Sequence, residues 1–516
     1  MNRVKIFISG LVALLILLVL ICEILILCFI SDRTIIVYMM MAMFIVEVIF
    51  AVYIVNTNRH ANTKIGWLVA ILCLPIVGCL LFVIFGVLPF NQKTWVSYNA
   101  DQAKFIKYEN YEYSQTVKKR NDDSATLFSY SLNCFLRPIY LNNDMQLITS
   151  NAQFYQECIS SIRSAKKFIH IETYIIHDGF FLRTIFCELI KKAQNGVKVR
   201  FLYDWYGSYR KFPYSMIKEL KSNGVEVGVF NPKGFNMFKG ATNYRLHRKA
   251  IIIDNETAIY GGSNIGDEYL NISKKTGHWK DYNFIIKGEI VNTINLGFCT
   301  DWIGFTGSTV STEQKLAFQN QIADILSIVK NEQKIEMQFT SSSPNYQEKG
   351  VNDTIFSLFS KAKKSIKIIT PYFLPTDTVI STLQSAAWSG IKVDIILPGQ
   401  NDDKDFILAM NRFSYNKLLN THINVHEFDG FIHAKIIIVD ETFVFITSAN
   451  LDFRSLWINF ENGILINNEV FANNLQKIFN QTLLQCNKVD QKFVNQFKLF
   501  RYNILYCALN FFRPMF

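Results

Sequence analysis

The sequence predicts a duplicated α/β fold that follows membrane-spanning helices at the N-terminus. Three observations support this prediction. The first 90 residues contain long apolar segments. From about residue 140, short apolar runs alternate with helical stretches, which is the pattern of an α/β protein. Blocks of this second part recur in the same order further along the chain, which indicates an internal duplication.

Composition narrows the class of protein. The chain has 516 residues, enough for roughly three domains. It is 50% hydrophobic and 18% charged, which excludes a disordered chain. The net charge of +11 predicts an anionic partner, either nucleic acid or an anionic lipid surface. Ten cysteines are too few for a disulfide scaffold and form no CxxC pair.

Three apolar segments near the N-terminus are each long enough to cross a bilayer, which takes about 20 residues. They are residues 7–30, 35–55 and 65–87. The first segment is too long for the apolar region of a signal peptide and lacks a small-residue cleavage site, so an uncleaved anchor is favoured. Together the three segments predict a multi-pass protein.

The third segment leaves the topology open. Pro75 and Gly78 lie at its centre, so it can kink or re-enter the bilayer instead of crossing straight. Basic residues at Arg3 and Lys5 place the N-terminus inside. Three full crossings would then place the rest of the chain outside, and a re-entrant third segment would leave it inside.

The duplication is visible as three blocks, each present twice and in the same order. The pairs are Ala165–Ile171 with Ala362–Ile368, Gly196–Val199 with Gly390–Val393, and His247–Lys249 with His433–Lys435. In each copy the first two blocks predict a helix end, a buried strand, a helix and a second buried strand. The third block leads into a further strand, Ala250–Ile253 or Ile436–Val439, and strands apolar on both faces indicate helices on both sides of the sheet.

These patterns divide the chain into six parts. We expect membrane segments in residues 1–90, a polar linker in 91–139, a first repeat in 140–305, a helical connector in 306–340, a second repeat in 341–490 and a tail in 491–516. The tail carries Phe, Leu and Tyr together with basic residues, which fits an amphipathic helix at a membrane interface. A helix packed on the second repeat fits the tail equally well.

One motif carries the chemistry, and it occurs in both repeats. The first copy has His247, Lys249 and Asp254 in the pattern H-x-K-x4-D, followed by a turn that ends in Asn264. The second copy has His433, Lys435 and Asp440 in the same pattern, followed by Asn450. A single H-x-K is a weak signal, but two at matching places of a repeat are strong. Since strand residues two apart point to one face, two copies face to face would gather two imidazoles and two ammonium groups.

Such a set suits exchange of a phosphodiester. One imidazole attacks phosphorus and holds the phosphoryl group covalently, while the other protonates the leaving alkoxide and then deprotonates the incoming alcohol. We expect the two lysines and two asparagines to neutralise the phosphate oxygens. A carboxylate on the far ring nitrogen would orient each imidazole, and Asp281 and Glu461 are the candidates, 34 and 28 residues after the histidines of their own copies.

Two aspartates and two histidines of the sequence are interpreted as structural residues. Asp254 and Asp440 belong to the catalytic motif, but each ends a predicted strand, so a turn anchor is favoured over direct catalysis. His422 and His426 lie four residues apart without a third ligand, so a metal site is disfavoured. Neither a His-Glu-x-x-His motif, a P-loop nor a Rossmann glycine fingerprint occurs, so no metal and no nucleotide cofactor is predicted.

At these residues the chain resembles the phospholipase D superfamily, and within it the bacterial cardiolipin synthases. The matching segments are residues 67–86, 243–249, 261–269 (GGSNIGDEY), 279–281 and 448–455 (SANLDFRS). The resemblance implies a bacterial cell-membrane enzyme that joins two phosphatidylglycerol molecules into cardiolipin with release of glycerol, without metal. It also implies that His247 is the nucleophile and His433 the acid, roles that the nearly equivalent copies do not assign by themselves.

The expected partners are therefore phosphatidylglycerol and anionic membrane lipid, and the membrane segments argue against nucleic acid. Two departures from the superfamily pattern stand in the turns before the asparagines. Thr447 replaces a usual glycine, and Gly262 replaces a frequent serine. Three alternatives stay open: a phospholipase D that uses water or another alcohol, a nuclease, and a lipid-binding protein with a decayed site. The oligomeric state is left undetermined.

Overall fold

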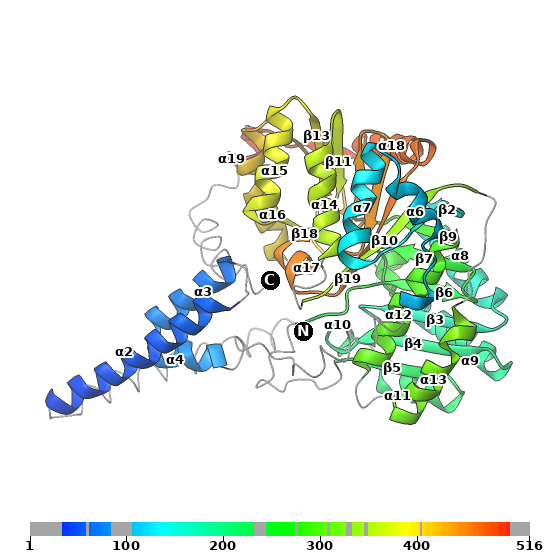
Figure 1. Cartoon of the computed structure of the whole chain (residues 1–516), viewed down its shortest axis with the longest axis horizontal. Helices are drawn as coiled ribbons and strands as arrows, with labels where there is room; N and C mark the ends of the chain where they lie inside the picture. Colours follow the sequence, from blue (N-terminus) through cyan, green and yellow to red (C-terminus); the bar gives the residue numbers. More distant parts are fainter. Residues whose placement is uncertain are drawn as a thin grey trace. The chain divides into compact units, whose positions relative to one another are not determined.

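The computed structural model describes residues 33–57, 61–83, 106–209, 211, 213–231, 244–273, 277–306, 310–326, 333–344, 349–402 and 405–495. The chain forms two compact units (Figure 1). The smaller unit comprises residues 1–91, 235–243 and 509–516, and the larger comprises residues 92–234 and 244–508. The predicted segment 7–30 lies outside the described residues.

The smaller unit contains three described helices: α2 (Arg33–Asn56), α3 (Ala61–Cys73) and α4 (Pro75–Leu81). Helix α2 is mainly apolar, and it contains the whole predicted segment 35–55. Residues Thr34–Asn56 of α2 are the one helical stretch in the described part of the chain that is long and apolar enough to cross a membrane.

The predicted third segment does not run as one straight helix. Helix α3 ends at Cys73, and Pro75 begins α4 after a break in backbone geometry at Leu74. Beyond the break the chain turns back, so that a Cβ at Gly78 would overlap the carbonyl oxygen of Ala70. Glycine is required at this close approach of two backbones. The proline and glycine therefore produce a helical hairpin in the part of segment 65–87 that the structure describes.

The larger unit contains two large sheets, one for each repeat, which share an order of seven strands; the second has one further strand at each edge. The first runs β2 (Asn143–Ile148), β9 (Asn283–Gly288), β7 (Thr257–Gly261), β6 (Ala250–Ile253), β3 (Phe168–Thr173), β4 (Lys198–Asp204), β5 (Glu226–Phe230). The second runs β1 (Ile139–Tyr140), β10 (Glu336–Ser342), β19 (Glu461–Asn467), β17 (Phe443–Thr447), β16 (Ile436–Val439), β11 (Ser365–Ile369), β13 (Lys392–Pro398), β14 (Asn424–Phe428), β20 (Cys486–Lys488). Strands β2 to β9 correspond in order to β10 to β19, which confirms the predicted duplication.

Helices cover both faces of each sheet, as the uniformly apolar strands predict. In the first repeat, Ile169 and Ile171 of β3 join the core formed with α8 (Asn151–Ser164), α9 (Phe180–Gln194) and α11 (Tyr214–Ser222). His170, on the opposite face of β3, stacks on Phe298 of α12 (Ile290–Phe305), with ring centroids 4.5 Å apart. Because successive side chains of a strand point to opposite faces, the sheet packs against a helical layer on each side.

The second repeat is built in the same way. Its core includes residues of α14 (Gly350–Lys361), α15 (Asp377–Trp388) and α16 (Asp405–Leu419). Helix α18 (Glu469–Leu483) follows β19 as α12 follows β9, and it contacts β14, β16 and β17. In Figure 1, α14 and α15 lie beside β11 and β13.

Three segments differ from the expected division. Residues 106–135, expected as linker, include α6 (Glu112–Lys118) and α7 (Asp123–Phe135), and Phe128 and Leu132 of α7 are buried in the core of the second repeat. The expected connector contains α13 (Thr312–Ile325) and most of strand β10. The tail begins with α19 (Gln491–Asn495), whose Val494 joins the same core, and residues 496–516 lie outside the described residues. Helices α7 and α19 therefore pack into the second repeat, whereas α13 packs on the first, where Phe318 contacts His170 and Trp302.

Candidate active site

The two histidine motifs lie where a chain segment of one repeat meets a segment of the other. His247 and Lys249 precede β6, and His433 and Lys435 stand between β15 (Phe431–Ile432) and β16. In both copies the lysine ammonium donates to the backbone carbonyl of the histidine two residues earlier. Each lysine ammonium is therefore held at the backbone of its own histidine.

Backbone hydrogen bonds join the repeats at these segments. The N–H of His247 donates to the carbonyl of Phe460, and the N–H of Phe460 donates to the carbonyl of Arg245, over 3.0 and 2.8 Å. In the other copy, β15 pairs in parallel with β8 (Trp279–Lys280), and the N–H of His433 donates to the carbonyl of Lys280 over 2.8 Å. Each histidine is thus fixed beside the residue that precedes a carboxylate of the other repeat.

The carboxylates are consequently exchanged between the repeats. Nδ1 of His247 lies 2.9 Å from Oε1 of Glu461, and Nδ1 of His433 lies 2.8 Å from Oδ2 of Asp281. Asp281 and Glu461 are brought to the histidines, as expected of orienting groups, but each serves the histidine of the opposite copy. Spacing within one copy holds no signal for this exchange, because it arises from contacts between the repeats.

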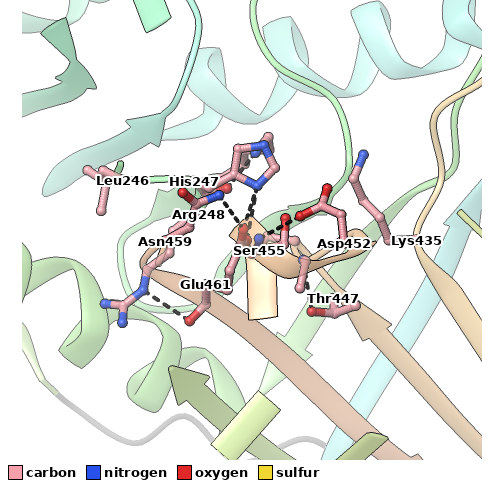
Figure 2. A network of polar contacts seen from close by, with 12 residues as sticks. Leu246, His247, Arg248, Lys435, Thr447, Asp452, Ser455, Asn459 and Glu461 are labelled. Atoms are coloured by element: carbon pink, nitrogen blue, oxygen red, sulfur yellow. Dashed lines mark hydrogen bonds and ion pairs between the residues drawn. The ribbon is translucent and has the colours of Figure 1, made fainter. Parts of the chain in front are cut away.

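Figure 2 shows the network around one of these pairs, with His247, Arg248 and Glu461 in the same view as Lys435 and Asp452. His247 is 8% exposed and His433 is 6% exposed, so both imidazoles are nearly withdrawn from solvent. Burial lowers the pKa of each imidazole to about 4, because it disfavours the charged form. Both rings are therefore neutral at pH 7.

The lysines are buried with them. Burial lowers the pKa of Lys249 to about 8 and that of Lys435 to about 7. The charge of Lys435 also lowers the pKa of His247, and the charge of Lys249 lowers that of His433. Each ammonium therefore acts on the imidazole of the other repeat, so the four groups form one electrostatic site.

The chemistry available to this arrangement follows from the ring nitrogens. A carboxylate at Nδ1 holds the proton there and leaves Nε2 with a lone pair. A neutral imidazole with a fixed tautomer can act as nucleophile or as general base. Two such rings with two ammonium groups suit the transfer of an anionic phosphoryl group.

Asp254 and Asp440 occupy equivalent places away from the histidines. Asp254 accepts hydrogen bonds from the backbone N–H groups of Lys166, Lys167 and Phe168, at 2.7, 2.8 and 2.7 Å. Asp440 accepts from those of Lys363, Lys364 and Ser365, at 2.8, 2.7 and 2.9 Å. Both aspartates therefore anchor the loop that leads into the first central strand of their sheet. These contacts favour the turn-anchor interpretation.

The two asparagines are less alike than the sequence suggests. Asn264 is engaged by the protein itself: Oδ1 accepts from the N–H of Ile175 over 3.1 Å, and Nδ2 donates to the hydroxyl of Tyr269 over 2.7 Å. Oδ1 of Asn450 is buried and has no hydrogen-bond partner among the described residues. The side chain of Asn450 also hydrogen-bonds to Asp452, so the two asparagines have different partners.

The departures at Thr447 and Gly262 have structural explanations. Gly261 pairs with Asn283 across the β7–β9 ladder, and Thr447 pairs with Gly463 across β17–β19, so each pair contains one glycine. The glycine of the pair is on β7 in the first repeat and on β19 in the second. A Cβ at Gly262 would lie 2.7 Å from Oδ1 of Asp281.

A serine hydroxyl nevertheless reaches each carboxylate. Ser263 donates to Asp281 over 3.1 Å, and Ser448 donates to Glu461 over 2.5 Å. Both turns therefore support the orienting carboxylate, from positions one residue apart.

Three buried charged residues were not predicted from the sequence. Arg248 lies 2.5 Å from Asp301 through Nη1 and Oδ2, and also donates to the carbonyl of Glu461 over 3.3 Å. Burial raises the pKa of Glu172 well above its usual value, and the charge of Asp301 raises it further. The sequence feature that could have indicated this cluster is Glu172, an acidic residue within the otherwise largely apolar strand β3. The second repeat has Ile369 and Ala434 at the corresponding places, so this cluster belongs to one repeat only.

The weak metal hypothesis finds no support in the described residues, where no three potential metal ligands lie together. His422 has a left-handed backbone, with φ of 60°, in the turn before β14, so the expected shared strand face does not form. His426 instead lies 3.3 Å from Asp394 through Nε2.

Comparison with known proteins identifies the family. A sequence model described as "Cardiolipin synthase, PLD-like domain" matches residues 158–302 and 355–483, and one described as "Phospholipase_D-nuclease N-terminal" matches residues 44–86. Cardiolipin synthase 2 of Bacillus anthracis is 33% identical over 408 residues, which cover 78% of this chain and 77% of the relative. The chain belongs to the cardiolipin synthase family.

Other relatives agree with this assignment. The cardiolipin synthase of Clostridium perfringens is 32% identical over 437 residues, covering 84% of this chain and 90% of the relative. Among solved structures, phosphatidylserine synthase of Haemophilus influenzae has a TM-score of 0.58 and 16% identity, and covers 76% of this chain and 100% of its own. That structure supports the duplicated fold. The chain is therefore a phospholipase D-like enzyme of the cardiolipin synthase family, with an apolar N-terminal helix that indicates membrane association.

Proposed function

We propose that this enzyme joins two phosphatidylglycerol molecules into cardiolipin and releases one glycerol, through a phosphohistidine intermediate. The observation that carries the proposal is the pair of neutral imidazoles, each hydrogen-bonded to a carboxylate of the opposite repeat. The likeness to named cardiolipin synthases supports the substrates.

In the first step, the Nε2 lone pair of His247 attacks the phosphorus of one phosphatidylglycerol. The P–O bond to the glycerol headgroup breaks as the N–P bond forms, and the glycerol oxygen takes a proton from His433. His433 must be protonated for this step, and an anionic phosphate bound beside it favours that form by charge attraction. Glu461 stabilises the positive charge that develops on His247.

In the second step, the free hydroxyl of another phosphatidylglycerol attacks the same phosphorus and gives its proton to His433. The N–P bond breaks, its electron pair returns to Nε2 of His247, and cardiolipin leaves. Lys249 and Lys435 supply the positive charge for the phosphate oxygens, and Asn264 and Asn450 support the loops beside them. The assignment of His247 as nucleophile and His433 as acid follows the family resemblance.

The multi-pass membrane arrangement is part of the proposal. Segments 7–30 and 35–55 have the length and apolar character of spans, and the hairpin of α3 and α4 supports a third segment that re-enters instead of crossing. Cysteine labelling from each side of vesicles tests this topology. A label at residue 60 and a label at residue 120 should react from the same side.

The decisive experiment incubates the purified full-length chain in vesicles of pure phosphatidylglycerol and separates the lipids by chromatography. Cardiolipin and free glycerol in equal amounts are expected. Phosphatidic acid would indicate water as the acceptor, and the absence of any new lipid would contradict the proposal. Rapid quenching of the wild-type enzyme during turnover, without acid, should reveal the phosphohistidine, and His247→Ala should abolish it.

A further inference from the structure

A second cluster of positive charge lies next to the histidine pair. Arg245 precedes His247 by two residues, in the segment that bridges to Phe460 of the other repeat. Arg454 comes from the other repeat, in the short helix α17 (Phe453–Trp457). The ring of Tyr174 contacts His247, with centroids 5.0 Å apart, and both arginines interact electrostatically with Tyr174.

Arg245 is 4% exposed, and its buried Nε–H group has no hydrogen-bond acceptor among the described residues. Its Nη1 donates to the carbonyl of Tyr244 over 3.0 Å, and its guanidinium lies 4.3 Å from the ring centre of the exposed Tyr206. A buried donor without an acceptor is costly, which indicates that an acceptor arrives with a ligand.

The nearby carboxylates are already committed to the backbone. Asp204 accepts from the N–H groups of Gly207 and Leu246, over 2.9 and 3.0 Å. Asp452 begins α17 by accepting from the N–H of Ser455 over 2.6 Å. Besides burial, the positive charge of Arg245 lowers the pKa of Arg454, so the two guanidinium groups repel each other. An anion between them would remove this repulsion.

The proposed function requires a second anion of this kind. Cardiolipin carries two phosphates joined through one three-carbon glycerol bridge, and only one of them reacts at the histidines. The other must lie within one headgroup of the reacting phosphorus, beside the imidazoles. A planar guanidinium fork suits a phosphate diester.

We propose that Arg245 and Arg454 bind the phosphate of the second, non-reacting phosphatidylglycerol, and thereby select an anionic phospholipid over water or a neutral alcohol as the acceptor. This inference rests on the proposed function and names the acceptor subsite of that reaction. The ligand group is a phosphate monoanion in a diester, carried by a lipid.

Two assays separate this role from donor binding and from folding. The first measures cardiolipin formed from phosphatidylglycerol. The second measures incorporation of labelled free glycerol into phosphatidylglycerol, which breaks and re-forms the donor bond without a second phospholipid. Arg245→Gln and Arg454→Gln are compared with the wild type and with Arg183→Gln, which changes an exposed arginine paired with Asp178.

We expect each glutamine variant to lower cardiolipin formation by at least tenfold while glycerol incorporation falls by less than threefold, and Arg→Lys at either position to restore part of the loss. Equal losses in both assays would overturn the inference and place the arginines at the donor phosphate or in the fold, and unchanged cardiolipin formation would overturn it as well. A wild type that makes no cardiolipin yet exchanges glycerol would instead contradict the proposed function. Melting temperature in detergent identifies a variant that fails to fold, and for such a variant the lysine form supplies the comparison.

Discussion

Nδ1 of His247 lies 2.9 Å from a carboxylate oxygen of Glu461, a residue 214 positions further along the chain and in the other repeat. His433 is bound in the reciprocal way to Asp281. Each histidine–carboxylate pair contains one residue from each repeat. Substitution of a carboxylate in one repeat is therefore expected to change the reactivity of the histidine in the other.

Glu461→Gln tests this exchange. The amide keeps the size of the side chain but removes the charge that stabilises a positive His247, so turnover is expected to fall about 10²–10⁴-fold. The double variant Glu461→Gln/His247→Ala should be no slower than His247→Ala alone, because both changes act on one group. Glu469→Gln, at an exposed glutamate of the same repeat, should leave cardiolipin formation unchanged. Additive losses in the double variant would show that Glu461 acts elsewhere.

The pH dependence of kcat/KM follows from the buried bases. His247 must be neutral to attack phosphorus, and its pKa of about 4 predicts that activity falls only when the pH drops toward 4. The lysines must be charged to hold the phosphate, and pKa values of about 7 and 8 predict a decline as the pH rises through this range. Lys435→Arg should shift the alkaline decline upward, because arginine keeps its proton. An acid limb near 6.5 would contradict the buried neutral imidazoles.

Asp254→Ala should weaken the fold more than the chemistry. Three backbone N–H groups lose a charged acceptor, which is expected to cost about 2–4 kcal/mol of unfolding free energy. Asp440→Ala is the matched variant, and its smaller effect is expected because Asp440 is less buried. Thermal melting in detergent measures the loss, and activity per folded molecule should remain within a few fold. Unchanged melting with abolished activity would instead assign these aspartates to catalysis.

Glu172→Gln should be well tolerated. Burial and the charge of Asp301 raise the pKa of Glu172, which favours the uncharged carboxyl group. An amide can replace that form, with a change in unfolding free energy within about 0.5 kcal/mol. Arg248→Met provides the contrast, because it removes the guanidinium bound to the buried Asp301 and is expected to cost about 3–5 kcal/mol. A strongly destabilised Glu172→Gln would mean that the side chain is ionised.

The sequence was most informative where local pattern decides structure. The strands Ala250–Ile253 and Ile436–Val439 have the predicted bounds, because their apolar runs end at aspartates with left-handed backbone. The break near Pro75 was also visible, since proline cannot continue a helix without strain. The matched motifs alone indicate His247 and His433.

Other features depend on contacts between distant segments and left no local signal. The exchange of Asp281 and Glu461 between the histidines arises from the bridges at Phe460 and Lys280. Helix α7 has an ordinary amphipathic pattern, and only packing against the second repeat makes it part of that core. Asn264 and Asn450 match in sequence, yet the hydroxyl of Tyr269 occupies one of them and leaves the pair unequal.

The reciprocal backbone bridges at Phe460 and Lys280 have a consequence for the ancestry of the enzyme. A half-length chain with one motif would carry an imidazole whose acidic companion sits on a different molecule, so such an ancestor could have worked only as a homodimer. Within one chain each half can differ from the other, as Glu172 and Arg248 of the first half differ from Ile369 and Ala434 of the second.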